Sequence, residues 1–162
     1  LRRSFRRIIK RNDNISLLLA PLQFKEEHFS LYRAYQSARH RGDGMDDSDP
    51  VKYQQFMTCS EIDSFMMELR DGDRLLAVSV LDRVVDGLSA VYTFFEPTED
   101  HRSLGTLAIL RQIDLALSAG HDYLYLGYWI SDCSKMSYKE RFSPLEEFDT
   151  NAQLWLLHPS VR

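Results

Sequence analysis

Apolar residues in the first part of the chain recur at two spacings, one typical of strands and one typical of helices. The apolar run over residues 15–22 predicts a first strand. Residues 24–41 predict a helix, because apolar and aromatic side chains recur there every three or four positions. This helix should end at the glycine-rich cluster that follows it. Pro50 suits the first turn of a second helix over residues 51–58.

After the second predicted helix, the hydrophobic pattern is typical of strands over three runs. Helical and strand-like segments then alternate to the end of the chain. Two such runs, 64–69 and 74–81, flank an Asp-Gly-Asp hairpin signal, and β-forming residues predict a third strand over 89–95. The remaining predicted elements are a helix over 103–119, a strand over 123–128, a short helix near 134–141 and a last strand over 152–157. The order predicts an α+β fold with a mixed, mostly antiparallel sheet flanked by helices.

This order of elements matches the layout of GNAT acetyltransferases. In that layout the strand before the long helix and the strand after it splay apart and open a cleft. We therefore expect a GNAT-like catalytic domain over residues 15–162, preceded by residues 1–14 as a basic linker or the start of the domain. Because the chain begins with Leu1 rather than Met, we expect that a segment before it is missing.

Composition indicates a globular protein of one domain, with 162 residues of which 44% are hydrophobic and 27% charged. No apolar run approaches the roughly 20 residues that a membrane helix needs, so we expect a cytoplasmic protein without a membrane partner. Cys59 and Cys133 belong to no CxxC pair, and no histidine cluster has ligand spacing. We expect two buried or half-buried thiols, no metal site and no cofactor.

Charge is unevenly distributed along the chain. The net charge is −4, which alone argues against nucleic-acid binding. The first 11 residues nevertheless contain six basic residues and no acidic one. A basic block on an acidic body is expected where one end of a protein contacts a phosphate backbone, although a merely solvated basic segment would look the same.

The start of the predicted 103–119 helix is the first candidate for chemistry. Its first turn holds Ser103, Gly105 and Thr106. Amides at a helix N-terminus can bind a phosphate or an acyl oxygen. In acetyltransferases this turn carries a double-glycine motif for coenzyme A, of which only Gly105 remains. The simpler interpretation makes Ser103 an N-cap and Gly105 a packing contact.

The second candidate is the aromatic run 123–130 with the basic segment that follows it. Its three tyrosines and Trp129 are unusual for a simple buried strand. Gly127 inside the run suggests a bulge or a close approach of a ligand to the backbone. Lys135 and Lys139 would share one face of a helix, where they could hold a carboxylate or a phosphate. A core strand followed by an amphipathic helix is the alternative.

The residues LGYWI at 126–130 and CSKMSYK at 133–139 resemble the signature of the arginyl- and leucyl-tRNA–protein transferases. SLGT at 103–106 and FSPLE at 142–146 resemble two further motifs of that family, and residues 35–45 resemble its bacterial branch. The resemblance covers nearly the whole chain, but the family's N-terminal region with its Cys cluster is not in this sequence. It implies transfer of an aminoacyl group, Leu in the bacterial branch, from aminoacyl-tRNA to proteins with N-terminal Asp or Glu, which marks them for degradation.

Given this resemblance, we expect site residues in four roles. The amides around Ser103, Gly105 and Thr106, or those beside Gly127, would hold the acyl oxygen or the terminal ribose-phosphate. The basic groups of Lys135, Lys139 and Arg83 would pair with the acceptor's carboxylate. His40 or Asp46 would accept the amine proton. The pocket for the aminoacyl group and adenosine would be lined by Tyr125, Tyr128, Trp129 and Met136, with Tyr128 also expected at the catalytic centre and Tyr138 among the substrate-binding residues.

Three other functions fit parts of the sequence. Arginyl transfer differs from leucyl transfer only in the donor. An acetyltransferase that uses acetyl-CoA would share the fold, although the double-glycine motif is missing. A non-catalytic module that binds RNA or peptides is the third.

Overall fold

The computed structural model describes residues 1–39, 49–130, 133 and 136–158. The chain divides into two compact units, Leu1–Tyr125 and Leu126–Arg162. We describe each unit by itself.

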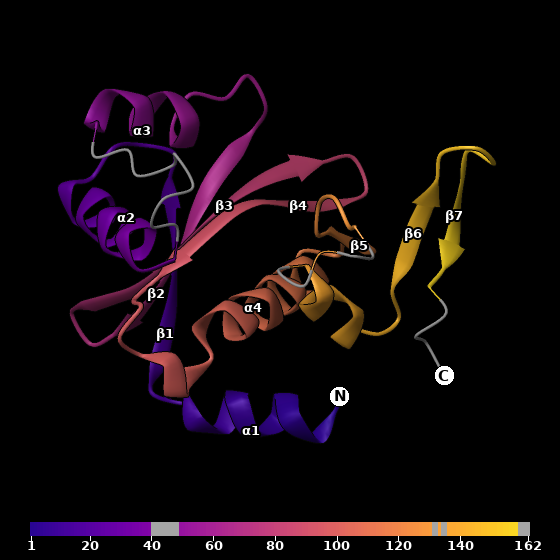
Figure 1. Cartoon of the computed structure of the whole chain (residues 1–162), viewed down its shortest axis with the longest axis horizontal. Helices are drawn as coiled ribbons and strands as arrows, with labels where there is room; N and C mark the ends of the chain where they lie inside the picture. Colours follow the sequence, from indigo (N-terminus) through magenta and orange to yellow (C-terminus); the bar gives the residue numbers. More distant parts are fainter. Residues whose placement is uncertain (40–48, 131–132, 134–135, 159–162) are drawn as a thin grey trace. The chain divides into compact units, whose positions relative to one another are not determined.

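The first unit is built on a five-stranded sheet with the order β1-β2-β3-β4-β5 (Figure 1). All neighbouring strands are antiparallel except β4 and β5, which are parallel. The strands are β1 (Ile15–Pro21), β2 (Ser64–Asp71), β3 (Arg74–Val84), β4 (Gly87–Phe95) and β5 (Tyr123–Tyr125). The helices are α1 (Arg3–Arg11), α2 (Glu26–Arg39), α3 (Pro50–Met57), a 3-10 turn η1 (Asp100–Arg102) and α4 (Leu104–Ser118). The prediction of a mixed, mostly antiparallel sheet flanked by helices is confirmed.

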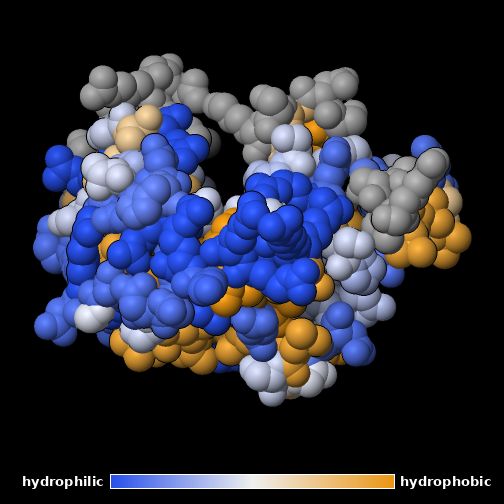
Figure 2. Space-filling view, turned by 90° about the horizontal axis from the view of Figure 1, so that it is seen from below, coloured by the Kyte–Doolittle hydropathy of each residue, from blue (hydrophilic) through white to orange (hydrophobic). Residues whose placement is uncertain are grey.

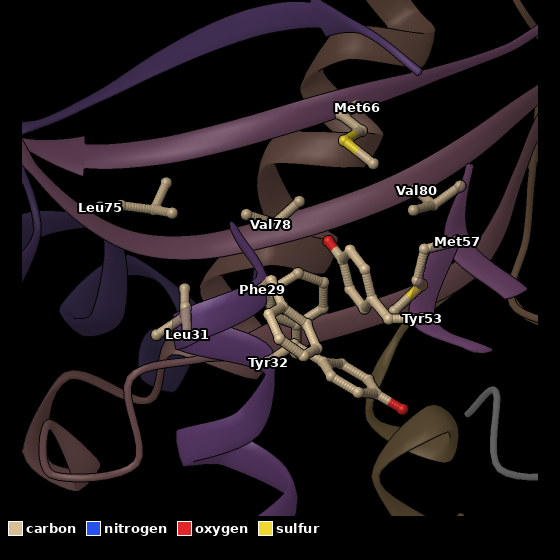
Figure 3. Packing of buried hydrophobic residues seen from close by; sticks show 10 residues of the cluster. Phe29, Leu31, Tyr32, Tyr53, Met57, Met66, Leu75, Val78 and Val80 are labelled. Atoms are coloured by element: carbon tan, nitrogen blue, oxygen red, sulfur yellow. The ribbon is translucent and has the colours of Figure 1, made fainter. Parts of the chain in front are cut away.

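Helices α2 and α3 cover one face of the sheet. Tyr53 of α3 is 2% exposed and its ring packs against Tyr32 and Phe29 of α2 at centroid distances of 5.0 and 5.2 Å. Figure 3 shows these rings gathered against Val78 and Val80 of β3. Each such side chain contributes about 1.5–3 kcal/mol when it is fully buried. This aromatic core fixes α2 against β3 and β4.

Helix α4 covers the opposite face of the sheet. Leu107 and Ala108 are fully buried, and Gln112 donates to the hydroxyl of Thr93 on β4 at 3.5 Å. Helix α1 packs on α4 and lies beyond it from the sheet in Figure 1. The first residues, interpreted from the sequence as a linker or the start of the domain, therefore form a helix that belongs to this unit.

Strand β4 is paired unequally on its two sides. Along β3 it is paired over nearly its whole length, whereas its pairing with β5 covers only Gly87–Ser89. The six residues of β4 beyond Ser89 have a strand partner only on the β3 side within the described part of the chain. The predicted strand over 123–128 is therefore too long, since β5 ends at Tyr125.

The second unit contains a two-stranded antiparallel sheet, β6 (Glu146–Asp149) with β7 (Leu154–Leu157), and a 3-10 turn η2 (Ser137–Arg141). The predicted last strand, 152–157, begins two residues before the observed β7, and its partner β6 is absent from the prediction. The predicted short helix near 134–141 is wrong in type, because its described part is a 3-10 turn.

Candidate functional site

The first turn of α4 offers three backbone donors. The amides of Leu104, Gly105 and Thr106 donate to no acceptor within the described residues, whereas the Leu107 amide donates to the Ser103 carbonyl at 3.0 Å. Ser103 has φ 55° and ψ 47°, and its side chain makes no capping hydrogen bond. Ser103 is therefore the N-cap residue of α4, as the simpler interpretation expected, but its side chain does not cap the helix. A non-glycine residue in this region is strained by about 1–3 kcal/mol, and such strain is found most often at functional sites.

Gly105 faces an aromatic ring at the end of β4. A Cβ on Gly105 would lie 3.0 Å from Cε1 of Phe95, so the packing contact expected for this glycine is confirmed. Tyr35 of α2 packs edge-on against Phe95 at 4.9 Å, and the Arg39 guanidinium lies 5.3 Å from the same ring. Burial raises the pKa of Tyr35, and Arg39 opposes this shift. Tyr35, Arg39 and Phe95 form an aromatic and basic wall beside the α4 amides that our site prediction lacked.

Tyr125 lies at the other end of β4 from this wall. It pairs with Ser89, and its hydroxyl donates to the Asp86 carboxylate at 3.0 Å. Phe95 lies six positions after Ser89 along the strand, which corresponds to about 20 Å. The structure therefore brings Ser103, Gly105 and Thr106 together but does not place Tyr125 with them.

Arg83 has partners of its own. Its Nη1 donates to Asp63 at 2.8 Å, and its guanidinium lies 4.2 Å from the centroid of the Phe65 ring. In this structure Arg83 therefore already pairs with an acidic side chain of its own unit.

Four of the expected site residues lie in the second unit: Gly127, Tyr128, Trp129 and Lys139. Gly127 has φ +74°, and no atom lies within 4 Å of its would-be Cβ. The positive φ therefore explains why a glycine occupies this position. The expected bulge within a strand does not explain it, because β5 ends at Tyr125. Tyr128 is 91% exposed, and its carbonyl accepts a hydrogen bond from the Lys139 ammonium. Lys139 is buried, and burial lowers its pKa. The Trp129 ring packs edge-on against His158 at 4.8 Å.

The indole N–H of Trp129 is buried without an acceptor within the part of the chain that the structure describes. Met136 directly precedes η2 and is half-buried, while Tyr138 is 40% exposed within that turn. His40, Asp46 and Lys135 lie outside the described residues. The expected pairing of Lys135 with Lys139 on one helix face therefore stays a prediction.

A buried carboxylate on β2 is the charged group that our site prediction missed. Glu68 is 2% exposed and accepts hydrogen bonds from Lys25 at 2.6 Å and from Arg70 at 2.7 Å. The His28 imidazole, which is fully buried, lies 2.8 Å from the same carboxylate. Arg70 also binds Glu27 through both of its terminal nitrogens. A glutamate inside an apolar strand was the sequence signal for this network.

The network shifts the ionisation of its two most buried members. Burial alone would raise the pKa of Glu68, but hydrogen bonds from Lys25, Arg70 and His28 outweigh it and hold the pKa at about 2. Burial lowers the pKa of His28 against the opposing effect of Glu68. The carboxylate is therefore ionised across the physiological range, and the network anchors α2 to β2 rather than offering an acid or a base.

Within the described residues, no three His, Cys, Asp or Glu side chains gather into a set that could hold a metal ion. Cys133 is half-buried as expected, whereas Cys59 is exposed, contrary to the prediction. No helix among the described residues is both long and apolar enough to span a membrane.

The amino-acid sequence matches the profile of a known protein family over most of its length. The sequence profile of the family described as "Arginine-tRNA-protein transferase, C terminus" covers residues 27–149. That range includes the α4 start, the wall on α2 and β4, and the aromatic segment 123–130.

Individual relatives carry a more specific name. A protein of Thiobacillus denitrificans named aspartate/glutamate leucyltransferase is 50% identical over 144 residues, which are 89% of this chain and 60% of the relative. Proteins of the same name from Chromobacterium violaceum and Alkalilimnicola ehrlichii are each 46% identical, over 89% and 96% of this chain and 60% and 64% of their own lengths. The chain thus spans about three fifths of the length of these relatives. Because the family's profile matches most of the chain, the chain belongs to the family of arginine-tRNA-protein transferase C-terminal domains.

Proposed function

We propose that this protein transfers leucine from aminoacyl-tRNA to the N-terminal α-amine of proteins that begin with Asp or Glu, marking them for degradation. The observation that carries the proposal is the 45–50% identity to several proteins named aspartate/glutamate leucyltransferase, over about nine tenths of this chain. A reaction on aminoacyl-tRNA would place the protein in the cytoplasm.

We also propose that the sheet is GNAT-like. Support comes from β4 and β5, which are parallel, joined through α4 and paired over three residues only. Two strands that separate in this way leave the end of β4 accessible beside the start of α4. The acyl donor would enter there, next to Phe95 and Gly105.

The proposed reaction requires mainly that the protein position its two substrates. The aminoacyl ester is already activated, and an α-amine with a pKa of about 7.7–8.0 is partly unprotonated near neutral pH. Holding amine and ester together can supply roughly 7–11 kcal/mol of the barrier. The three unbonded amides at the start of α4 would hold the acyl oxygen as negative charge develops on it. The Phe95 and Tyr35 rings would pack against the leucine side chain or the terminal base.

Other roles in the proposal rest on the sequence. His40 or Asp46 would accept the amine proton, and Lys135 would pair with the acceptor's carboxylate. Tyr128 and Trp129 would contact the donor, a role that the exposure of Tyr128 and the unpartnered indole N–H of Trp129 support. The buried Lys139 would instead hold the Tyr128 carbonyl in place.

A transfer assay tests the proposed function. The protein should transfer labelled Leu from Leu-tRNA to a peptide that begins with Asp, and a matched peptide that begins with Ala should stay unlabelled. Arg-tRNA and acetyl-CoA serve as competing donors in parallel reactions. Transfer of Arg but not Leu would contradict the donor, and acetylation without aminoacyl transfer would contradict the reaction.

A further inference from the structure

Helix α1 presents a basic surface that the proposed chemistry does not use. Phe5 and Ile8 are buried on the side where the helix packs on α4. The exposed side chains form what we call the α1 basic face, which consists of Arg2, Arg3, Arg6, Arg7, Lys10 and Arg11. Figure 2 looks at the side of the molecule on which α1 lies in Figure 1, and strongly hydrophilic side chains gather at the centre of that view.

The charges of this face are uncompensated. Among the described residues, none of its six members makes an ion pair, and Arg11 donates a hydrogen bond to the backbone carbonyl of His101. Arg70 and Arg102 in the same unit do pair with carboxylates. Like charges three and four residues apart destabilise a helix, and cations in its first turn oppose its dipole. A polyanion bound along α1 would relieve both effects.

The α1 basic face is fixed to the loop that leads into α4. Asn12 is fully buried, and its side-chain amide donates to the Ile8 carbonyl at 2.9 Å and to the Arg102 carbonyl at 3.0 Å. Arg102 is directly followed by Ser103 and the unbonded amides of α4. The end of the basic helix is therefore held one residue from the proposed aminoacyl site.

We propose that the α1 basic face docks the phosphate backbone of the tRNA acceptor stem, whose 3′ end carries the aminoacyl ester to the start of α4. This inference rests on the proposed function, because that function supplies the tRNA. An RNA backbone fits the face better than a membrane does. Phe5 and Ile8, which a membrane would need, are buried within the unit. Phosphates require only exposed cations, which the face supplies along its length.

Binding of uncharged tRNA tests the inference directly. Labelled tRNA is titrated with the chain at several salt concentrations, and the fourfold variant R3Q/R6Q/R7Q/K10Q is compared with wild type. We expect affinity at about 0.1 M salt to fall at least 30-fold, and the slope of log K against log salt to fall by about one per lost contact. The single variant Arg7→Gln should show a smaller loss. Its matched control is Lys52→Gln on α3, an exposed position at the opposite end of the unit in Figure 1, which should bind within twofold of wild type.

Three outcomes would overturn the inference. The first is an unchanged affinity and salt slope in a fourfold variant whose circular dichroism is that of wild type. The second is an equal loss in Arg7→Gln and Lys52→Gln, which would indicate a general charge effect. The third is α1-dependent binding to phosphatidylglycerol vesicles but not to tRNA.

The design separates this inference from the proposed function. Binding of uncharged tRNA requires no transfer, so α1-dependent binding without leucyl transfer would contradict the proposed function and support the inference. If wild type transfers leucine, the fourfold variant should show a raised KM for Leu-tRNA with kcat unchanged, as expected for lost ground-state binding. An unchanged KM would contradict the inference alone.

Discussion

Replacing Glu68 by Gln is expected to lower the free energy of unfolding by about 3–5 kcal/mol, the usual cost of removing one partner from a buried ion pair. The substitution keeps the size of the side chain but leaves Arg70 and the fully buried His28 beside a neutral amide. Such a loss is a large part of the roughly 5–15 kcal/mol that stabilises a domain. Urea unfolding followed by circular dichroism measures the change.

The matched control for this substitution is Glu27→Gln, which removes a half-exposed partner of the same arginine. It should cost no more than about 1 kcal/mol, because exposed ion pairs contribute little. A loss below about 1 kcal/mol in Glu68→Gln as well would contradict the role that we assign to the network.

The effect of Glu68 should depend on pH with a definite sign. The folded pKa of Glu68 is about 2, below its ordinary value of 4.5, so its stabilisation is complete above pH 4.5. It is lost as the pH falls from 4.5 toward 2. The stability difference between wild type and Glu68→Gln should therefore shrink across that window.

Replacing Gly105 by Val is expected to reduce kcat/KM for aminoacyl transfer about 100-fold. The first added carbon would already lie 3.0 Å from the Phe95 ring, so the ring or the first turn of α4 must shift. A displacement of about 1 Å in a positioning site is enough for such a loss. The transfer assay with Leu-tRNA and an Asp-initiated peptide measures it.

Two further variants serve as comparisons for Gly105→Val. Gly105→Ala places one carbon against the edge of the ring, which can move by a few tenths of an ångström, so its loss should be smaller. Ser118→Val adds a branched side chain at an exposed position in the last turn of the same helix and should leave transfer close to wild type. A folded Gly105→Val protein that transfers leucine within threefold of wild type would show that the start of α4 does not position the substrate.

Local signals predicted the elements that local interactions determine. Helix α3 begins at Pro50 as expected, and Asp49 caps it through the Val51 amide. The first hairpin turns at Gly72, since Asp71 pairs with Arg74. The long helix α4 lies within one residue of its predicted bounds. In each case a turn or cap residue acts on neighbours close to it in the chain.

Elements determined by distant partners were predicted poorly. The β-forming residues after Tyr125 predicted a longer strand, but β4 pairs with β5 over only three residues. Strand β6 is polar and exposed, so it shows no apolar alternation, and its pairing with β7 alone defines it.

The residues of the candidate site also fall into two groups, those that a local sequence signal indicates and those that only the fold brings together. The α4 start was visible as a motif, whereas Tyr35 and Phe95 meet only because the aromatic core holds α2 against β4. Glu68 could be noticed as a charge in an apolar strand. Its partners Lys25 and His28 lie about 40 residues away, and the fold alone brings them to it.

The central claim is that the start of α4 binds the aminoacyl end of the donor. It is tested most directly by titrating the isotopically labelled protein with a non-hydrolysable leucyl-adenosine analogue and following the backbone amide signals by NMR. We predict saturable shifts of the Gly105 and Thr106 amides, with smaller shifts at Phe95 and Tyr35. Saturable shifts elsewhere, for example along β6 and β7, with the amides of Gly105 and Thr106 unmoved, would contradict the claim.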